Sequence, residues 1–208
     1  MSIHSFLPSD LDNRTLYGFF TSAIIPRPIA FVSTINSQGG VNLSPFSYFN
    51  VVSTRPPILI FAPVRQVRDG KQKDTYENIK EVAECVIHLV HFELAEKMNI
   101  TSTPFPSEIN EFNEAGLTEI PSDLVKPPRV KECKLAFECK VNQIVELGEG
   151  GGAGSLMICE ILKIHVDQDI LTDKNKIDAL KLGAIGRLGN NQYVRITEDN
   201  LFEMDRPE

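Results

Sequence analysis

Apolar residues recur with two different spacings along this chain, and each spacing predicts a different kind of element. Apolar runs of strand length, bounded by turn residues, predict eight strands, at 29–34, 41–44, 46–53, 58–62, 85–90, 135–147, 156–166 and 193–196. Helical spacing predicts five helices, at 12–22, 74–83, 91–100, 107–116 and 174–182. Strands dominate, and the helices do not alternate strictly with them. The pattern therefore favours a mainly β fold, an antiparallel barrel with peripheral helices, over a doubly wound parallel sheet.

Turn and cap residues mark the joints between these elements. The glycine-rich segment 148–154 is expected to connect two strands. It is not a phosphate loop, because it lacks the Gly-Lys-Ser/Thr ending and leads into a strand instead of a helix. Pro45 follows Ser44 inside a strand pattern, so we expect it to interrupt the strand and leave nearby backbone N–H groups free for a ligand. Asp74, three residues before Glu77, is expected to cap the next helix.

Length and composition indicate a single domain over residues 1–208. With 208 residues, of which 42% are hydrophobic, the chain can form a core without disulfides. It begins with no signal-peptide pattern, and no apolar run approaches the roughly 20 residues of a membrane helix. We therefore expect a cytoplasmic protein without a membrane partner. The four cysteines form no Cys-x-x-Cys pair, so they are expected to be buried hydrophobic residues and not zinc ligands.

Charge is distributed unevenly along the chain. The net charge is −7, which disfavours nucleic acid as a partner. Residues 1–104 hold nine basic and nine acidic residues, whereas residues 105–208 hold 12 basic and 19 acidic residues and carry the whole −7. Within the neutral half, residues 55–73 hold five basic residues against Asp69 alone, a local charge of +4. A basic segment that ends at a helix start indicates a site for an anion.

The candidate binding chemistry lies between residues 26 and 75, around that basic segment. Hydroxyl, amide and lysine side chains gather there, at Ser33, Thr34, Asn42, Ser44, Ser47, Lys73 and Thr75. Charge-assisted hydrogen bonds to such groups are worth roughly 1.5–3 kcal/mol each, so a few of them could hold a phosphate. The histidines do not have metal-binding spacing, and no nucleophile motif is present. We therefore expect neither a metal site nor a catalytic side chain.

Four motifs in order give the sequence a family resemblance. They are Pro-Arg-Pro-Ile-Ala-Phe-Val-Ser-Thr at 26–34, Asn-Leu-Ser-Pro-Phe-Ser-Tyr-Phe at 42–49, Lys-Asp-Thr-Tyr-Glu-Asn-Ile at 73–79, and Gly-Arg-Leu-Gly at 186–189 followed by Tyr193. From about Tyr17 to Ile196 the chain resembles the flavin reductase-like family with an FMN-binding split barrel of Greek-key type. Flavoredoxin-like members and the reductase components of two-component monooxygenases are the most similar.

The resemblance implies a homodimer that binds FMN at or near the subunit interface. It implies that the backbone around Asn42, Leu43, Ser44, Pro45 and Ser47 lines the isoalloxazine ring. Ser33, Thr34, Lys73, Asp74 and Thr75 would lie toward the ribityl chain and phosphate, and Arg187 and Tyr193 would border the flavin. Asn190 and Asn191 stand where relatives carry two glycines. Gly154 and Ser155 stand where many relatives place a histidine.

Three functions remain open at this point. The first is an NAD(P)H-dependent flavin reductase, with NADH or NADPH as reductant and a monooxygenase component or another protein as acceptor. Hydride transfer between stacked rings needs alignment more than a side-chain base, which fits the lack of an acid–base motif. The second is a flavoredoxin-like electron carrier with no nicotinamide site of its own. The third is a non-enzymatic flavin-binding module.

Overall fold

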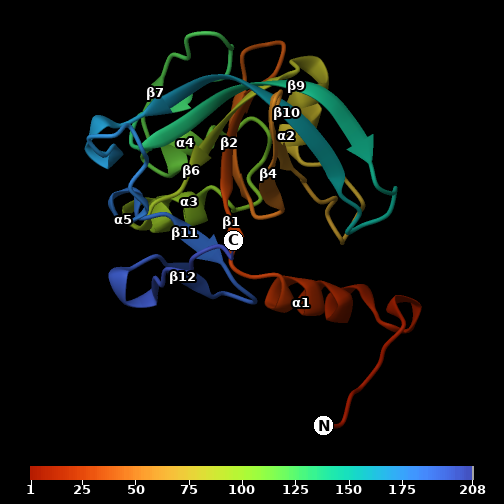
Figure 1. Ribbon diagram of the computed structural model, residues 1–208. Helices are drawn as coiled ribbons and strands as arrows, with labels where there is room; N and C mark the ends of the chain where they lie inside the picture. Colours follow the sequence, from red (N-terminus) through yellow and green to blue (C-terminus); the bar gives the residue numbers. More distant parts are fainter. Residues whose placement is uncertain (208) are drawn as a thin grey trace.

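The computed structural model describes residues 1–207 and confirms a mainly antiparallel β fold (Figure 1). Seven strands form one antiparallel sheet in the order β3-β2-β6-β9-β10-β5-β4. Their bounds are β2 (Ala30–Ile35), β3 (Val41–Phe46), β4 (Phe49–Thr54), β5 (Pro57–Phe61), β6 (Glu84–Leu89), β9 (Leu135–Glu146) and β10 (Ser155–Val166). The two long strands, β9 and β10, cross the upper part of the molecule as a curved ribbon. The segment 148–154 connects them as a hairpin, as predicted.

The sheet curls into a barrel that stays open along one seam. Its two edge strands, β3 and β4, follow each other in the chain with only Ser47 and Tyr48 between them. The two edges must therefore meet at this corner, and the Phe46 and Phe61 rings touch there with centroids 5.5 Å apart. No ladder joins β3 to β4 among the described residues. This geometry is a split barrel, as predicted.

Two hydrophobic layers hold the barrel together. Inside it, alternate residues of β2 such as Ala30 and Val32 pack with Ile79 of helix α2 (Asp74–Glu81). This inner layer includes three of the four cysteines, Cys85, Cys139 and Cys159. Outside it, Phe31 and Leu43 pack against helix α3 (Ala95–Ile100) and helix α4 (Glu111–Glu114). Strand β2 is thus covered on both faces, which explains its nearly continuous apolar sequence.

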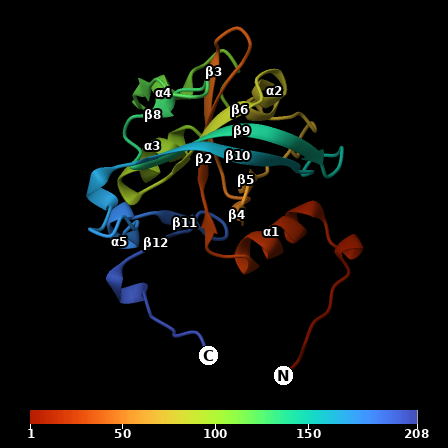
Figure 2. The same cartoon turned by 45° about the horizontal axis from the view of Figure 1, so that its top comes forward.

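A second, small sheet attaches beside the barrel and was only partly predicted. It consists of β1 (Arg27–Pro28), β11 (Ile185–Arg187) and β12 (Tyr193–Arg195), in the order β1-β11-β12. Only the last of these strands was expected, because β1 and β11 are too short to show a periodic pattern. Figure 2 shows the β11–β12 hairpin and helix α1 (Asn13–Ala23) on the same side of the barrel. A further pair, β7 (Glu119–Ile120) and β8 (Arg129–Val130), was not expected from the sequence.

The helices differ from prediction mainly at their ends. Asp12 caps α1 by accepting a hydrogen bond from Thr15 N at 2.7 Å, which confirms that start. Asp74 does not cap α2: Lys73 occupies the cap position, and the Asp74 carboxylate accepts from Ser107 Oγ at 2.7 Å. The helix expected at 107–116 shrinks to α4, and the one expected at 174–182 shrinks to α5 (Ala179–Leu182). The helix expected at 91–100 begins as a 3-10 turn (Phe92–Leu94) and continues as α3.

Three further short 3-10 turns occur in the described part of the chain, at Pro8–Asp10, Gln168–Ile170 and Glu198–Asn200.

Pro45 does not interrupt its strand, contrary to our expectation. Strand β3 continues through Pro45 to Phe46, and Pro45 pairs with Phe31 of β2. On this edge strand, Leu43 N points out of the sheet and donates to Glu111 Oε2 at 3.0 Å. Pro45 is two residues further along, so its nitrogen faces the same open edge. A proline is tolerated there because no ladder hydrogen bond is needed.

Candidate functional site

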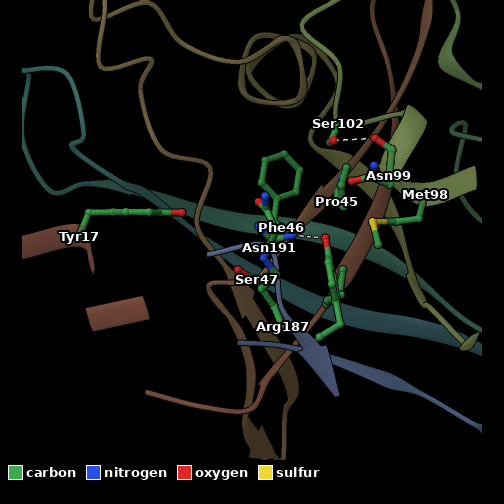
Figure 3. Close-up of a pocket in the computed structure, with 11 residues that line it drawn as sticks. Tyr17, Pro45, Phe46, Ser47, Met98, Asn99, Ser102, Arg187 and Asn191 are labelled. Carbon is green, nitrogen blue, oxygen red and sulfur yellow. Dashed lines mark hydrogen bonds between the residues drawn. The ribbon is translucent and has the colours of Figure 1, made fainter. Parts of the chain in front are cut away.

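One cavity, of about 650 Å³, lies where the barrel seam meets the small sheet (Figure 3). We call it the arginine cavity, and its lining residues are Tyr17, Ile29, Pro45, Phe46, Ser47, Met98, Asn99, Ser102, Arg187, Asn191 and Tyr193. Figure 3 shows Pro45, Met98, Asn99 and Ser102 gathered on one side, with Ser47, Asn191 and Arg187 below them and Tyr17 standing apart. Arg187 is the one charged residue among those that line it.

The guanidinium of Arg187 is held in a fixed position at the wall of this cavity. It lies over the Tyr193 ring, 4.5 Å from the centroid, and donates to the Tyr193 hydroxyl. It also donates to the carbonyl oxygen of Asn190 at 2.7 Å. These contacts all lie within the β11–β12 hairpin. A cation stacked on an aromatic ring gains about 0.5–1 kcal/mol at an exposed site, so the hairpin presents Arg187 ready for an anion or a polarisable ring.

A second cavity, of about 350 Å³, adjoins the first along the β3 edge. We call it the lysine cavity, because Lys71 and Lys73 line it together with Arg68. Arg68 contacts Asp69 at 3.6 Å. Neither lysine pairs with a carboxylate within 4.0 Å among residues 1–207. The two lysines are therefore available for an anionic ligand, as the local +4 indicated.

The two cavities form one continuous site. They share three lining residues, Pro45, Phe46 and Ser102. Ser102 follows α3, and its hydroxyl donates to Asn99 O at 2.6 Å. Together the cavities fall in the range of roughly 300–1,000 Å³ typical of small-molecule sites. An elongated ligand with an anionic end fits this outline better than a compact one.

A buried polar network supports the floor of the lysine cavity. In the orientation that satisfies both ends of its amide, Asn42 donates to Glu111 Oε1 at 3.1 Å and accepts from Thr75 Oγ1 at 2.8 Å. The other oxygen of Glu111 accepts from Leu43 N. Burial raises the pKa of Glu111, and the nearby carboxylate of Asp74 raises it further. The network fixes β3 against α2 and α4, so that the edge facing the cavities is rigid.

Eight of the twelve predicted binding residues line the two cavities. They are Asn42, Ser44, Pro45, Ser47, Lys73, Asp74, Arg187 and Tyr193. The other four, Ser33, Thr34, Leu43 and Thr75, are almost fully buried and line neither cavity.

The polar side chains among those four already have partners within the protein. Ser33 Oγ donates to Pro128 O at 2.5 Å, and Thr34 Oγ1 accepts from Asn78 at 3.1 Å. Thr75 is held by Asn42. These contacts hold elements together behind the site: Ser33 ties β2 to the 121–128 segment, Thr34 ties β2 to α2, and Thr75 ties α2 to β3. Their expected place toward the ribityl chain and phosphate stays a prediction.

The sequence analysis missed residues that reach the site from other elements. Gln66, Arg68 and Lys71 come from the basic segment, in which only Lys73 was chosen. Asn99 and the segment 101–106 come from α3 and the loop after it. The basic composition was a usable signal for the first group. For the second group no local signal exists, because its place depends on how α3 packs on the outer layer.

One cluster of possible metal ligands, Asp123, Glu138 and His165, lies elsewhere in the structure. Its charges are already compensated: Glu138 accepts from Asp123 N at 2.8 Å, Leu124 N at 2.6 Å and His165 Nε2 at 2.7 Å. Lys163 pairs with Asp123 at 2.5 Å. These contacts tie the 121–128 segment to β9 and β10, and a metal ion would have to displace them.

A curled antiparallel sheet that stays open along one seam places this protein in the class of split-barrel proteins. Residues 22–180 match the family described as the flavin reductase like domain. Because this match spans well over half of the chain, the protein belongs to the flavin reductase-like family, as the sequence motifs indicated. None of the described helices is long and apolar enough to cross a membrane.

Relatives and solved structures cover nearly the whole chain. An uncharacterised protein of Aquifex aeolicus (strain VF5) is 40% identical over 190 residues, spanning 91% of this chain and 94% of the relative. Nitrilotriacetate monooxygenase component B from Bacillus cereus is 32% identical with a TM-score of 0.91, covering 98% of this chain and 100% of that one. The 2-nitrobenzoate 2-nitroreductase NbaA of Pseudomonas fluorescens is 29% identical with a TM-score of 0.86, covering 98% and 96% of the two chains.

Proposed function

We propose that the protein binds FMN along the β3 edge and acts as an NAD(P)H-dependent flavin reductase. The observation that carries the proposal is the pair of joined cavities. One offers two lysines without carboxylate partners among the described residues, and the other combines aromatic and apolar side chains with serine and asparagine side chains and a single cation. FMN has a matching shape, a phosphate at one end and a planar ring at the other. Membership of the flavin reductase-like family supports the same cofactor.

The phosphate would lie in the lysine cavity. Lys71 and Lys73 would supply charge, and Ser44 would supply a hydroxyl donor. Charge-assisted hydrogen bonds of this kind are roughly twice as strong as neutral ones. The acidic residues that line this cavity cancel only part of this charge. Asp69 is paired with Arg68, and burial raises the pKa of Glu111, which leaves the carboxylate of Asp74 against the two lysines.

The ring would lie in the arginine cavity, between the β3–β4 corner and the β11–β12 hairpin. Ile29 and Met98 provide an apolar floor, and the Arg187–Tyr193 stack closes one side. When bound there, FMN would supply the chemistry of accepting a hydride from a nicotinamide. The protein's own task is to hold the ring in place and to keep its surroundings free of carboxylates. No side-chain acid or base is needed for such a step.

The protein is also proposed to be a homodimer, with reduced flavin passed to a monooxygenase component or another acceptor. Helix α1 supports the first part, since it exposes several apolar side chains to solvent. The similarity to a monooxygenase component B supports the second. A cytoplasmic location stays a prediction from the sequence.

Replacement of Lys71 and Lys73 tests the phosphate assignment. We expect the double variant Lys71→Ala/Lys73→Ala to bind FMN at least about 10-fold more weakly, since each lost charge-assisted contact is worth on the order of 1.5 kcal/mol or more. Riboflavin, which lacks the phosphate, should bind both proteins equally. Fluorescence quenching of each flavin measures the affinities. Lys174→Ala, at an exposed site outside both cavities, is the matched control. Equal FMN affinity in all three proteins would refute the assignment.

An electron carrier of flavoredoxin type is the second candidate function. Ser155 stands where many relatives place a histidine, and its hydroxyl is already engaged, accepting from Gln72 Nε2 at 3.1 Å and donating to Glu146 at 2.9 Å. This candidate predicts FMN binding with reduction by dithionite, but no reduction by NADH or NADPH.

A further inference from the structure

Arg27 is a buried cation directly behind the wall of the arginine cavity. Only 5% of its surface is exposed. Its guanidinium donates to the carbonyl oxygens of Thr21 at 2.5 Å, Ile24 at 2.9 Å and Leu188 at 3.0 Å. Its Nε donates to Ser47 Oγ at 3.4 Å, and Ser47 lines the cavity. The arginine thus joins the end of α1, the β11–β12 hairpin and the β3–β4 corner at one point.

All of these acceptors are neutral. No carboxylate lies within 4.0 Å of the Arg27 guanidinium in the part of the chain that the structure describes. A buried charge without a counter-charge is costly, even when its hydrogen bonds are satisfied. Arginine has enough N–H donors to hold these three elements together, which no neutral side chain has. Its choice also places an uncompensated positive charge directly behind the cavity wall.

A second arginine stands opposite the first. In the β1–β11 pair, Arg27 lies directly across from Arg187. Like charges at paired strand positions repel each other. The residues lining the arginine cavity include no Asp or Glu to offset them. The two arginines therefore give this cavity a positive potential, and an anion bound there would relieve their repulsion.

We propose that Arg27 and Arg187 together make the arginine cavity selective for the reduced, anionic form of the flavin ring. The inference rests on the proposed FMN binding. The oxidised ring is neutral, and addition of a hydride brings two electrons and one proton, so the ring gains one negative charge. The paired arginines stabilise that charge and bind the oxidised ring without such a gain. Arg27 does not line the cavity, so it is a positioning residue that acts through its field and through its hold on Ser47 and the hairpin.

The test compares FMN affinity in the two redox states. For each protein, the dissociation constant of oxidised FMN is measured in air and that of dithionite-reduced FMN without oxygen. The ratio of the oxidised to the reduced constant is the readout, because a merely structural role would change both constants together. We expect Arg27→Gln to lower this ratio about 10-fold or more, and Arg27→Lys to keep it close to the wild-type value.

Two further variants keep the result interpretable. Arg187→Gln should lower the ratio in the same way, and it contacts only its own hairpin, so it carries the test if Arg27→Gln does not fold. Arg55→Gln, in the exposed turn between β4 and β5, should leave the ratio unchanged. An unchanged ratio in folded Arg27→Gln, or in Arg187→Gln where Arg27→Gln does not fold, would overturn the inference. Failure of the wild-type protein to bind either form of FMN would instead contradict the proposed function.

Discussion

At the scale of single residues, His88 shows how a buried polar group is held in one protonation state. Its Nδ1 lies 2.9 Å from Phe31 O, and its Nε2 accepts from Val130 N at 2.9 Å. The ring must therefore be neutral, with the proton on Nδ1. Desolvation lowers the pKa of His88 to about 4, and the charge of Arg129 lowers it as well. His88 links β2, β6 and β8, so it contributes to stability and not to the cavities.

This shift predicts that the protein loses stability in mild acid. Between pH 6.5 and about 4 the unfolded chain binds a proton at His88 that the folded chain does not bind. The free energy of unfolding should therefore fall as the pH falls through this window, by on the order of 3 kcal/mol in total.

Urea unfolding at pH 7 and at pH 5 measures the effect. The variant His88→Gln can still donate and accept but does not titrate, so it should lose less stability between these pH values than the wild type. His4→Gln, an exposed residue near the N-terminus, is the control and should behave like the wild type. A His88→Gln variant with the full acid sensitivity of the wild type would contradict this assignment.

Single residues also show where sequence reasoning reached its limit. Ser44, Lys73 and Arg187 were chosen from composition and motif, and all three line one of the cavities. Ser33 and Thr75 have the same chemistry but are buried with partners. Side-chain type indicates the chemistry of a region, whereas the direction of a side chain depends on strand register, and a one-residue difference reverses it.

At the scale of elements, two glycines let the β11–β12 hairpin approach its neighbours. A Cβ atom at Gly186 would lie 2.8 Å from Pro26 Cβ, and one at Gly189 would lie 2.5 Å from Ser22 Oγ of α1. Between them, Leu188 O accepts from Arg27, and Arg187 faces the cavity. The two glycines of the Gly-Arg-Leu-Gly motif therefore let the hairpin pack closely against Pro26 and α1, where the hairpin forms one wall of the site. Its residues could be read from the sequence, but β1, which receives it, could not.

We expect Gly189→Ala to loosen this docking. The added methyl group would collide with Ser22 Oγ at 2.5 Å and crowd Ser22 Cβ and Cα at 3.2 and 3.3 Å, so the hydroxyl must rotate and α1 or the hairpin must shift slightly. Such overpacking costs roughly 1–3 kcal/mol of stability. Since the hairpin carries Arg187 and Tyr193, FMN affinity should fall as well.

Thermal unfolding and FMN titration measure the two effects. Gly150→Ala is the matched control, because a Cβ atom at Gly150 meets no other atom within 4 Å. Equal melting temperatures for these two variants would show that the close approach of Gly189 to α1 does not matter.

At the scale of the whole molecule, α1 is a long helix that the rest of the chain leaves largely uncovered. Figures 1 and 2 both show it outside the barrel. Thr21 is its one buried residue, and Tyr17, Phe20 and Phe19 are 57%, 50% and 45% exposed. Ile24, directly after the helix, is 63% exposed. An apolar face of this kind usually marks a protein interface. Tyr17 also lines the arginine cavity, so the proposed dimer would form close to the site.

The variant Phe20→Glu/Ile24→Glu should therefore be monomeric where the wild type is a dimer. Placing two carboxylates in a buried apolar interface costs several kcal/mol per charge. Light scattering coupled to size-exclusion chromatography gives the mass directly. Leu124→Glu, which adds a charge at an exposed apolar residue far along the chain, should remain a dimer. A wild-type protein that is monomeric at all concentrations would contradict the proposed dimer.

The fold as a whole was more predictable than the site. The long strands β9 and β10 and the antiparallel class followed from apolar patterning, because each long element carries its own periodic signal. The joined cavities did not, because they form where the β3–β4 corner, α3 and the β11–β12 hairpin meet. Ser47 and Arg187, which line the same cavity, are 140 residues apart in the chain.

The central claim is that the protein binds FMN and reduces it with a nicotinamide. The most direct measurement is the visible spectrum of the FMN-loaded protein without oxygen, before and after addition of NADH or NADPH. We predict that the flavin band bleaches with at least one of the two nucleotides, to the same extent as with dithionite. A band that persists with both nucleotides but bleaches with dithionite would contradict the reductase and favour the electron carrier. Absence of any bound flavin would contradict the account as a whole.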